Sequence, residues 1–407
     1  MSPEPGTVPR QSPRFLLLYT AAVAGGSVAY VPFLTIILPL QATALAGDDA
    51  LTLLAYAAFA GAITASLANI FFGWASDVTR ARRPWIAAGL LLSCALMVVM
   101  PLASSGPMLV GLIVAWQLGL NMMLAPLAAW AGDHVPDGQK GLLGGLLAFA
   151  PALGALAGII VTAPALGFAA ERHVVVATMV MLLVSPALLS ARPHAIPVLL
   201  APVPTVPSSA TLRQRFRRPA SKMWAARLLV QIAEASLFAF MLLWFRSVDP
   251  GFDENRAATI FTLVLSIAVV FTLAIGRWSD RANRPMLPLT ICAALVAAGL
   301  LAMAAAETLA LAVTAYAFFG LASSIFLALH SSQTLRVLPA PQHRGRDLGV
   351  FNLTNTVPSL VMPWLTLALV PSHGFSALFI VLATLAAMAS LLLATMTSSP
   401  KAIARPE

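Results

Sequence analysis

The chain has 407 residues, of which 59% are hydrophobic and only 10% are charged. Soluble domains carry roughly 25% charged residues, so this composition excludes a chain with a fully water-facing surface and indicates one that lies in lipid. The two cysteines, Cys94 and Cys292, fall in apolar stretches, which argues against a disulfide scaffold or a cysteine-based metal cluster and predicts two small core residues. The net charge of +9 does not require a nucleic-acid partner, because basic cytoplasmic loops of a membrane protein give the same excess.

A membrane-spanning helix needs about 20 mostly apolar residues, and twelve stretches of this chain meet that requirement. The first is too long for the roughly 7–15-residue apolar region of a cleavable signal peptide, so we expect it to remain as a helix. The predicted spans are residues 15–40, 51–72, 85–103, 108–131, 142–165, 174–190, 223–245, 257–275, 286–305, 309–331, 348–370 and 375–396.

The loops between these spans are short, except for a Pro-rich, basic segment at the midpoint of the chain. That segment is where a protein of two six-helix bundles would be hinged. We therefore expect a disordered cytoplasmic tail, a first bundle, a cytoplasmic linker, a second bundle and a second cytoplasmic tail, over residues 1–13, 14–190, 191–222, 223–397 and 398–407.

The distribution of the 24 Lys and Arg residues predicts the orientation in the membrane. With the N-terminus in the cytoplasm, all but Arg172, Arg246 and Arg256 fall on the cytoplasmic side. The reverse orientation would violate the positive-inside rule. We expect a multi-pass protein of the inner (plasma) membrane with both termini in the cytoplasm.

Two of the predicted loops repeat one pattern. Residues 73–84 read G-W-A-S-D-V-T-R-A-R-R-P, and residues 276–285 read G-R-W-S-D-R-A-N-R-P. Each loop joins the second span of its half to the third. A second pair of segments, at residues 135–141 and 338–345, is separated by the same 203 residues as the two loops, and carries Val-Pro and Leu-Pro followed by Gly. Internal repeats of this kind are typical of transporters built from two related halves.

The two loops resemble the signature loop of the major facilitator superfamily. The G-x-x-S-D…R-R-P form seen in the first loop, together with residues 345–352 (G-R-D-L-G-V-F-N), is similar to glycoside–cation symporters and sucrose-type transporters. The resemblance implies an all-α membrane protein with the major facilitator fold, in which twelve helices form two pseudo-symmetric six-helix bundles and transport a small molecule by alternating access. The chain departs from proton-coupled relatives in having no Arg in its fourth span and from drug–proton antiporters at residues 145–154. It also lacks the first-half acids of sodium-coupled sugar symporters.

We expect the two loops to form a cytoplasmic gate. Glycine permits close helix approach, and an Asp at a helix end binds backbone N–H groups or a basic residue. We expect Asp77 and Asp133 to meet Arg344 or Arg346 when the cytoplasmic side closes; the repeat aligns Asp133 with Arg336. The alternative is a capped turn flanked by ordinary basic anchors, which meet lipid headgroups. The predicted gate residues are Gly73, Asp77, Arg80, Arg83, Asp133, Gly276, Asp280, Arg284, Arg336, Arg344 and Arg346.

Glu234 is the one acidic residue near the centre of a predicted span. It lies about 11 residues into its helix, which places it roughly 16 Å deep in an apolar core of about 30 Å. Arg227, Gln231 and Phe238 share its helical face. An ionisable side chain at this depth is costly and is a functional candidate, so we expect Glu234 to carry a proton or to bind a cation or a substrate donor. The alternative is a structural Glu that is hydrogen-bonded to a neighbouring helix.

Other polar and aromatic side chains in the spans are candidates for the solute pathway, where amides and hydroxyls suit a polyhydroxylated or amide-bearing cargo and aromatic rings stack on its apolar faces. Each is also a candidate for helix packing, and His330 for gating. These residues are Tyr30, Trp116, Gln117, Asn121, His330, Gln333, Asn352 and Asn355.

The sequence predicts proton-linked uptake of a small polar or sugar-like compound. The alternatives are an exporter of amphiphilic compounds or drugs and a non-transporting membrane scaffold or enzyme. A nucleotide-binding loop of the form G-x-x-x-x-G-K-[ST] does not occur, so ATP drive is not expected. The expected partners are a small-molecule substrate, membrane lipids and a coupling proton; we expect a monomer with no cofactor, metal or nucleic acid.

Overall fold

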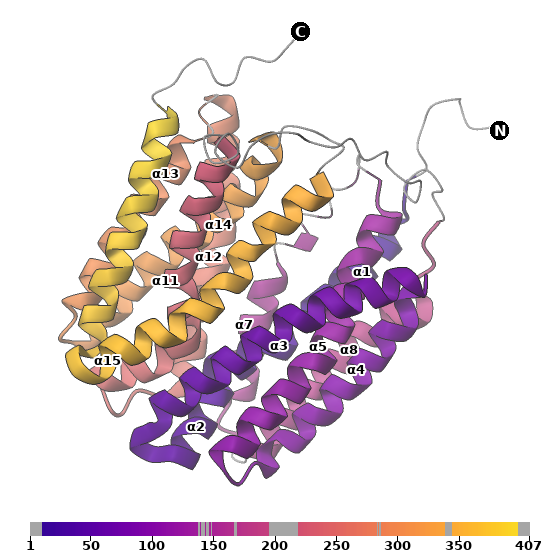
Figure 1. Ribbon diagram of the computed structural model, residues 1–407, viewed down its shortest axis with the longest axis horizontal. Helices are drawn as coiled ribbons and strands as arrows, with labels where there is room; N and C mark the ends of the chain where they lie inside the picture. The colour runs from indigo at the N-terminus through magenta and orange to yellow at the C-terminus, as the bar shows by residue number, and fades with distance from the viewer. Residues whose placement is uncertain are drawn as a thin grey trace. The chain divides into compact units, whose positions relative to one another are not determined.

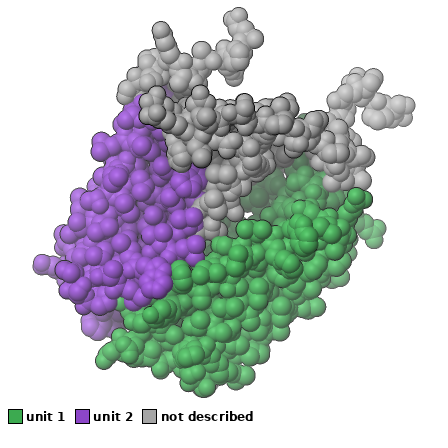
Figure 2. Space-filling view, viewed as in Figure 1, with its two compact units in different colours: residues 1–202 green, residues 203–407 purple. Residues whose placement is uncertain are grey.

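The computed structural model describes residues 10–136, 139, 143, 146–147, 149–166, 169–194, 219–282, 284, 286–337 and 344–397, and these residues form helices and short connections. The chain divides into two compact units, residues 1–202 and 203–407 (Figure 2). Most of the predicted tails and the centre of the predicted linker lie outside the described residues.

The helices of unit 1 are long and lie side by side (Figure 1). The first predicted span comprises an α-helix, a π-helical segment and a second α-helix, and the later helices follow after short connections. In chain order they are α1 (Pro13–Pro32), the π-helix Phe33–Ile37, α2 (Leu38–Ala46), α3 (Ala50–Val78), α4 (Arg82–Val99), α5 (Gly106–His134), α7 (Ala150–Val161) and α8 (Ala169–Ser190).

Unit 2 repeats this arrangement of long helices (Figure 1). Its last helix contains one residue with non-helical backbone angles, Gly374, at φ 73° and ψ 177°. A positive φ favours glycine, and here it lets the chain turn between the two last predicted spans. The helices are α11 (Pro219–Val248), α12 (Glu254–Arg281), α13 (Leu287–Ala304), α14 (Leu309–Val337) and α15 (Arg344–Thr397).

The helix pairs that pack together are the same in the two units. In unit 1, α5 packs against α3 and α4, while α1 packs against α7 and α8. In unit 2, α14 packs against α12 and α13, while α11 packs against α15. Since α1, α3, α4 and α5 occupy the same order as α11, α12, α13 and α14, the repeat seen in the two loops extends to the packing of the bundles.

The described helices agree with the predicted spans. Nine helical segments of the described residues are long and apolar enough to cross a membrane. Two of them, Pro13–Val78 and Val357–Met396, each extend over parts of two predicted spans, and the shorter apolar helix Ala150–Val161 lies within the fifth. Each of the twelve predicted spans therefore contains a described helix.

The first repeated loop is more helical than expected. α3 continues to Val78, so only Thr79, Arg80 and Ala81 connect it to α4. The G-W-A-S-D segment contains no helix breaker after Gly73, and the helix stops where Arg80 adopts the left-handed region at φ 50°. A turn of this kind commonly ends a helix.

The crossing of α4 and α5 depends on Gly89. A Cβ atom at Gly89 would overlap the backbone nitrogen of Met123 and would lie 2.8 Å from the carbonyl oxygen of Gly119. Because backbone atoms cannot move aside as a flexible side chain can, an alanine here must push the two helices apart. Small residues at such crossings are what allow membrane helices to pack closely.

We expect Gly89→Ala to lower the free energy of unfolding by about 1–3 kcal/mol, the usual cost of overpacking. The measurement is the melting temperature of the purified protein. Gly111→Ala in α5 is the matched control, because no described atom lies within 4 Å of a Cβ at Gly111. The control should be neutral or slightly stabilising, since alanine favours helix more than glycine does. Equal melting of both variants would contradict the close crossing.

Gln11 fixes the start of the chain to unit 1, so the predicted disordered tail ends before this residue. Gln11 is only 2% exposed, and its Nε2 donates to the carbonyl oxygens of His134 at 2.8 Å and His194 at 2.7 Å. Its Oε1 accepts from the backbone N–H of His194 at 2.9 Å. Its own backbone N–H and carbonyl bond to the side chain of Gln139 at 2.6 and 3.0 Å. One side chain thus joins the chain start, the end of α5 and the segment after α8.

Gln11→Ala is expected to lower the free energy of unfolding by about 1–3 kcal/mol, because it leaves partly buried backbone groups without hydrogen bonds. Thermal unfolding of the full chain measures the effect. Arg10→Ala, at the exposed neighbouring position, should melt like the wild type. A Gln11→Ala protein with an unchanged melting temperature would show that these bonds do not stabilise the bundle.

Candidate functional site

Glu234 lies near the middle of α11. Its Oε2 accepts a hydrogen bond from the Nε2 of Gln231, one turn earlier, at 3.3 Å. Among the described residues, this carboxylate takes part in no ion pair. The side chain is partly buried, and the positive charge of Arg227, two turns earlier on α11, acts on it electrostatically.

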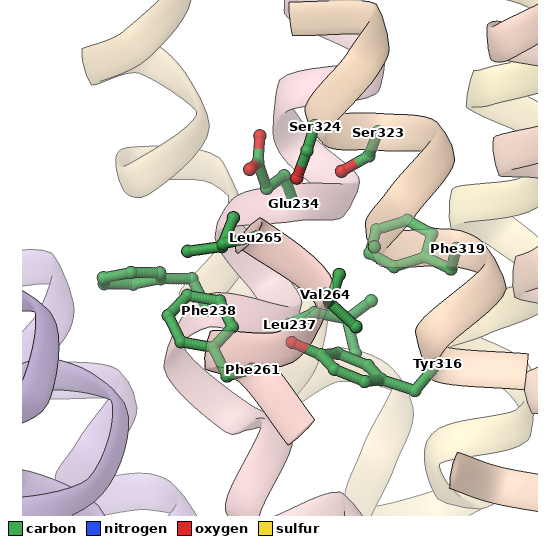
Figure 3. Close-up of a pocket in the computed structure, with 11 residues that line it drawn as sticks. Glu234, Leu237, Phe238, Phe261, Val264, Leu265, Tyr316, Phe319, Ser323 and Ser324 are labelled. Carbon is green, nitrogen blue, oxygen red and sulfur yellow. The ribbon is translucent and has the colours of Figure 1, made fainter. Parts of the chain in front are cut away.

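A small pocket adjoins Glu234 between α11, α12 and α14 (Figure 3). In Figure 3 the carboxylate lies at the same end as the hydroxyls of Ser323 and Ser324, while Tyr316 directs its hydroxyl into the pocket. The cavity volume is about 30 Å³, room for one or two water molecules. The remaining lining is apolar or small, and comprises Leu237, Phe238, Phe261, Val264, Leu265, Phe319 and Gly320.

Two polar contacts fasten the first half of α11 to its neighbours. The Nη2 of Arg227 donates to the Oδ1 of Asn355 in α15 at 3.2 Å. The Nε2 of His330 in α14 lies 2.9 Å from the carbonyl oxygen of Met223. His330 is fully buried, and its ring packs against Phe326, so the geometry favours the packing role over gating.

In unit 1 the predicted pathway amides are bonded to one another. Asn69 in α3 donates to the Oδ1 of Asn121 in α5 at 3.3 Å. Asn121 in turn donates to the carbonyl oxygen of Gln117 at 2.9 Å and to its Oε1 at 3.3 Å. Gln117 and Asn121 are both buried. This chain of amides joins α3 to α5, so part of its hydrogen-bonding capacity is used for helix packing.

The predicted aromatic contacts fall into two kinds. Trp116 is fully buried and its ring centroid lies 4.8 Å from that of Phe33, which is a packing position within unit 1. Phe238 lines the pocket beside Glu234 and meets Phe261 edge-on with ring centroids 6.1 Å apart. Tyr30 is a partly exposed residue of α1.

The first repeated loop is organised by Arg82, at the start of α4. Its guanidinium forms an ion pair with Asp77 at the end of α3 and another with Asp133 at the end of α5, the latter at 2.9 Å from Nε to Oδ2. Its Nη1 also donates to the Oγ of the buried Ser76 at 2.6 Å. One planar fork of donors therefore holds three helix ends together, a geometry that lysine cannot reproduce.

The other predicted gate residues of unit 1 are placed less centrally. Arg83 donates to the carbonyl oxygen of Ala191, and its guanidinium carbon lies 5.3 Å from the ring centroid of Trp130, a cation–π contact. Arg80 is exposed. A Cβ at Gly73 would have no described atom within 4 Å, so the described residues show no close helix approach at this glycine.

In the second repeated loop, the motif serine Ser279 bonds to the backbone of Arg284, near the end of the loop. The Oγ of Ser279, 2% exposed, donates to the carbonyl oxygen of Arg284 at 3.3 Å, and the backbone N–H of Arg284 donates to the carbonyl of Ser279 at 3.2 Å. A Cβ at Gly276 would meet Leu329 at 3.4 Å, an ordinary contact that does not require glycine. The side chains of the remaining predicted residues lie outside the described part: Asp280, Gln333, Arg336, Arg344, Arg346 and Asn352.

Comparison with known proteins decides the family. The chain matches the profile of the Major Facilitator Superfamily over residues 15–340 and 223–407. The chain belongs to the Major Facilitator Superfamily. It is therefore a multi-pass membrane protein and a secondary transporter of a small molecule rather than an enzyme.

Solved structures of superfamily members share the fold of this facilitator. A POT family peptide transporter in an auto-inhibited state matches with a TM-score of 0.71 and 12% identity, over 97% of this chain and 99% of the other. A bacterial homologue of the iron transporter ferroportin, in an outward-facing state, matches with a TM-score of 0.65 and 14% identity, over 95% and 99%. These identities show the fold alone. No curated protein sequence matches the chain, and no finding supports the narrower resemblance to glycoside–cation symporters.

The structure adds residues that the sequence did not single out. Arg82 is not among the predicted gate residues, although it is the first arginine of the Arg-Arg-Pro that ends the first motif. Ser76 and Ser279 occur at the same place in both repeats, and that repetition was the available signal. Tyr316 and Ser323 carried no signal, because single hydroxyls are common in apolar helices.

Proposed function

We propose that this facilitator couples the transport of a small organic solute to proton movement through Glu234. The observation that supports the proposal is a carboxyl group at the centre of a predicted span, without an ion pair among the described residues, beside a pocket. A carboxylate in such an environment is stable only if it is protonated or compensated by a bound cation. Alternation of Glu234 between the protonated state and the cation-bound state couples proton movement to solute transport.

The proposed orientation places both termini and the two repeated loops in the cytoplasm, as the distribution of Lys and Arg predicts. In this proposal Arg82 orders the loop of the first half, while Asp77 and Asp133 remain partly exposed. We propose that these carboxylates meet Arg344 or Arg346, the gate partners predicted from the sequence, when the cytoplasmic side closes.

The cargo is proposed to be small, and two classes are supported by different observations. The buried amides of unit 1 favour a polar or sugar-like compound, although Asn69, Asn121 and Gln117 already bond to one another. The apolar lining beside Glu234 favours an amphiphilic compound, and with it the exporter alternative. A polar cargo would therefore go with uptake, and an amphiphilic cargo with export.

Proton linkage can be tested with purified protein reconstituted into proteoliposomes that contain a pH-sensitive dye. A panel of solutes is added outside, and the internal pH is followed. A transported solute should change the internal pH with a rate that saturates as its concentration rises. Liposomes without protein and an ionophore that collapses the pH gradient are the controls. Transport of a labelled solute that is unaffected by the pH gradient would refute the proposal.

A further inference from the structure

The pocket beside Glu234 has two chemically different ends. The polar end holds the carboxylate and the hydroxyls of Ser323 and Ser324 (Figure 3). The rest of the lining consists of rings and aliphatic side chains of three helices, among them Phe261 and Phe319, and of Tyr316, which directs its hydroxyl into the pocket (Figure 3). A ligand that satisfies both ends carries a hydrogen-bond donor with positive charge at one end and an apolar group next to it.

Among the described residues that line the pocket, Glu234 is the one acidic side chain. On α11, Arg227 is two turns before Glu234 and bonds to Asn355. On the described part of α14, the titratable side chains are Tyr316, which lines the pocket, and His330, which bonds to Met223. The residues of α12 that line the pocket are apolar, and Asn355 of α15 accepts a hydrogen bond from Arg227 of α11. Glu234 itself accepts one hydrogen bond, from Gln231 at 3.3 Å.

The size of the cavity narrows the choice of ligand. A volume of about 30 Å³ fits a group of the size of one or two waters, such as a primary ammonium group. Aromatic faces within about 6 Å of a cation also attract it through the ring quadrupole, so the rings of the lining favour an ammonium group over a hydroxyl.

We propose that the cargo is an amine with an adjacent apolar group, whose ammonium binds the Glu234 carboxylate and whose apolar part packs against Phe238 and Phe261. This rests on the proposed function, because it names the cargo of the same site. The ammonium and the coupling proton then compete for one carboxylate, and each displaces the other.

Binding to the full-length protein in detergent tests the proposal with a matched pair of ligands. The probes are 2-phenylethylamine and 2-phenylethanol, which differ in the charged group, and binding is read from tryptophan fluorescence at about pH 6 and about pH 8. The amine remains protonated at both values, since alkyl amines titrate near pH 10. We expect the amine to bind at least tenfold more tightly than the alcohol at the higher pH, and to weaken as the pH falls.

Glu234→Gln should remove both the preference for the amine and its pH dependence, and Glu307→Gln, in an exposed connection, should keep them. Equal binding of amine and alcohol to the wild type, or an amine preference that survives Glu234→Gln, overturns the cargo class. The ligand comparison on the wild type holds even if the variant fails to fold. Amine binding that needs Glu234 but does not vary with pH supports the cargo class and refutes proton linkage, so the two proposals fail separately.

Discussion

Glu234→Gln is expected to abolish the pH dependence of transport. Glutamine keeps the shape of the side chain and can still accept the hydrogen bond from Gln231, but it cannot release or bind a proton. If one proton is exchanged at Glu234, the wild-type rate should change by up to about tenfold per pH unit on one side of its optimum, because a shift of one unit corresponds to a tenfold change in protonation. The variant should change by less than about twofold over the same range.

The measurement is the initial rate of solute transport in proteoliposomes, at a series of pH values imposed equally on both sides. Glu307→Gln is the matched control, since it removes an equal charge from an exposed connection between α13 and α14. Solute-driven proton flux should disappear in the Glu234 variant alone. A variant that retains both the wild-type pH profile and the wild-type rate would remove Glu234 from the mechanism.

Arg82→Gln is expected to loosen the first repeated loop and destabilise unit 1. The guanidinium is 15% exposed and joins Asp77, Asp133 and Ser76, so its removal leaves two carboxylates close together without a shared cation. Loss of one partner costs about 3–5 kcal/mol for buried pairs and at most about 1 kcal/mol for exposed ones. With Asp77 64% exposed, we expect an intermediate loss of about 1–3 kcal/mol.

Melting of the purified protein should show this loss as a decrease of roughly 5 °C, and the rate of transport should fall with it. Arg82→Lys separates charge from geometry: it keeps the positive charge but lacks the planar fork of donors, so it should recover less than half of the stability. Arg256→Gln, at an exposed position near the start of α12, controls for the loss of one basic residue. An Arg82→Gln protein with wild-type melting and transport would show that the loop does not depend on this guanidinium.

Most helices of the fold can be predicted from local stretches of the sequence. A run of about 20 apolar residues can satisfy its backbone in lipid only as a helix, so each predicted span contains a described helix, including Ala150–Val161 in the fifth. The duplicated G-x-x-S-D loops indicated two related halves, and the packing pairs of the two units repeat in the same order. The ends of the helices were less well predicted, because hydropathy marks what is apolar and α3 continues as helix through the polar Ser76 and Asp77.

The candidate site was predictable only in part. The sequence alone determined that Glu234 is the one acidic residue deep in a span, because the cost of a charge in lipid makes such a residue rare. It could not tell which amides serve helix packing. Asn69 and Asn121 are distant in the chain and meet only because α3 packs against α5, and Asn121 then also bonds to Gln117 on its own helix. Nor could it tell that Arg82, rather than Arg80 or Arg83, would reach both Asp77 and Asp133. Those outcomes depend on which helix ends meet, and only the tertiary structure decides that, because an ion pair between α3, α4 and α5 requires their side chains to converge within a few ångströms.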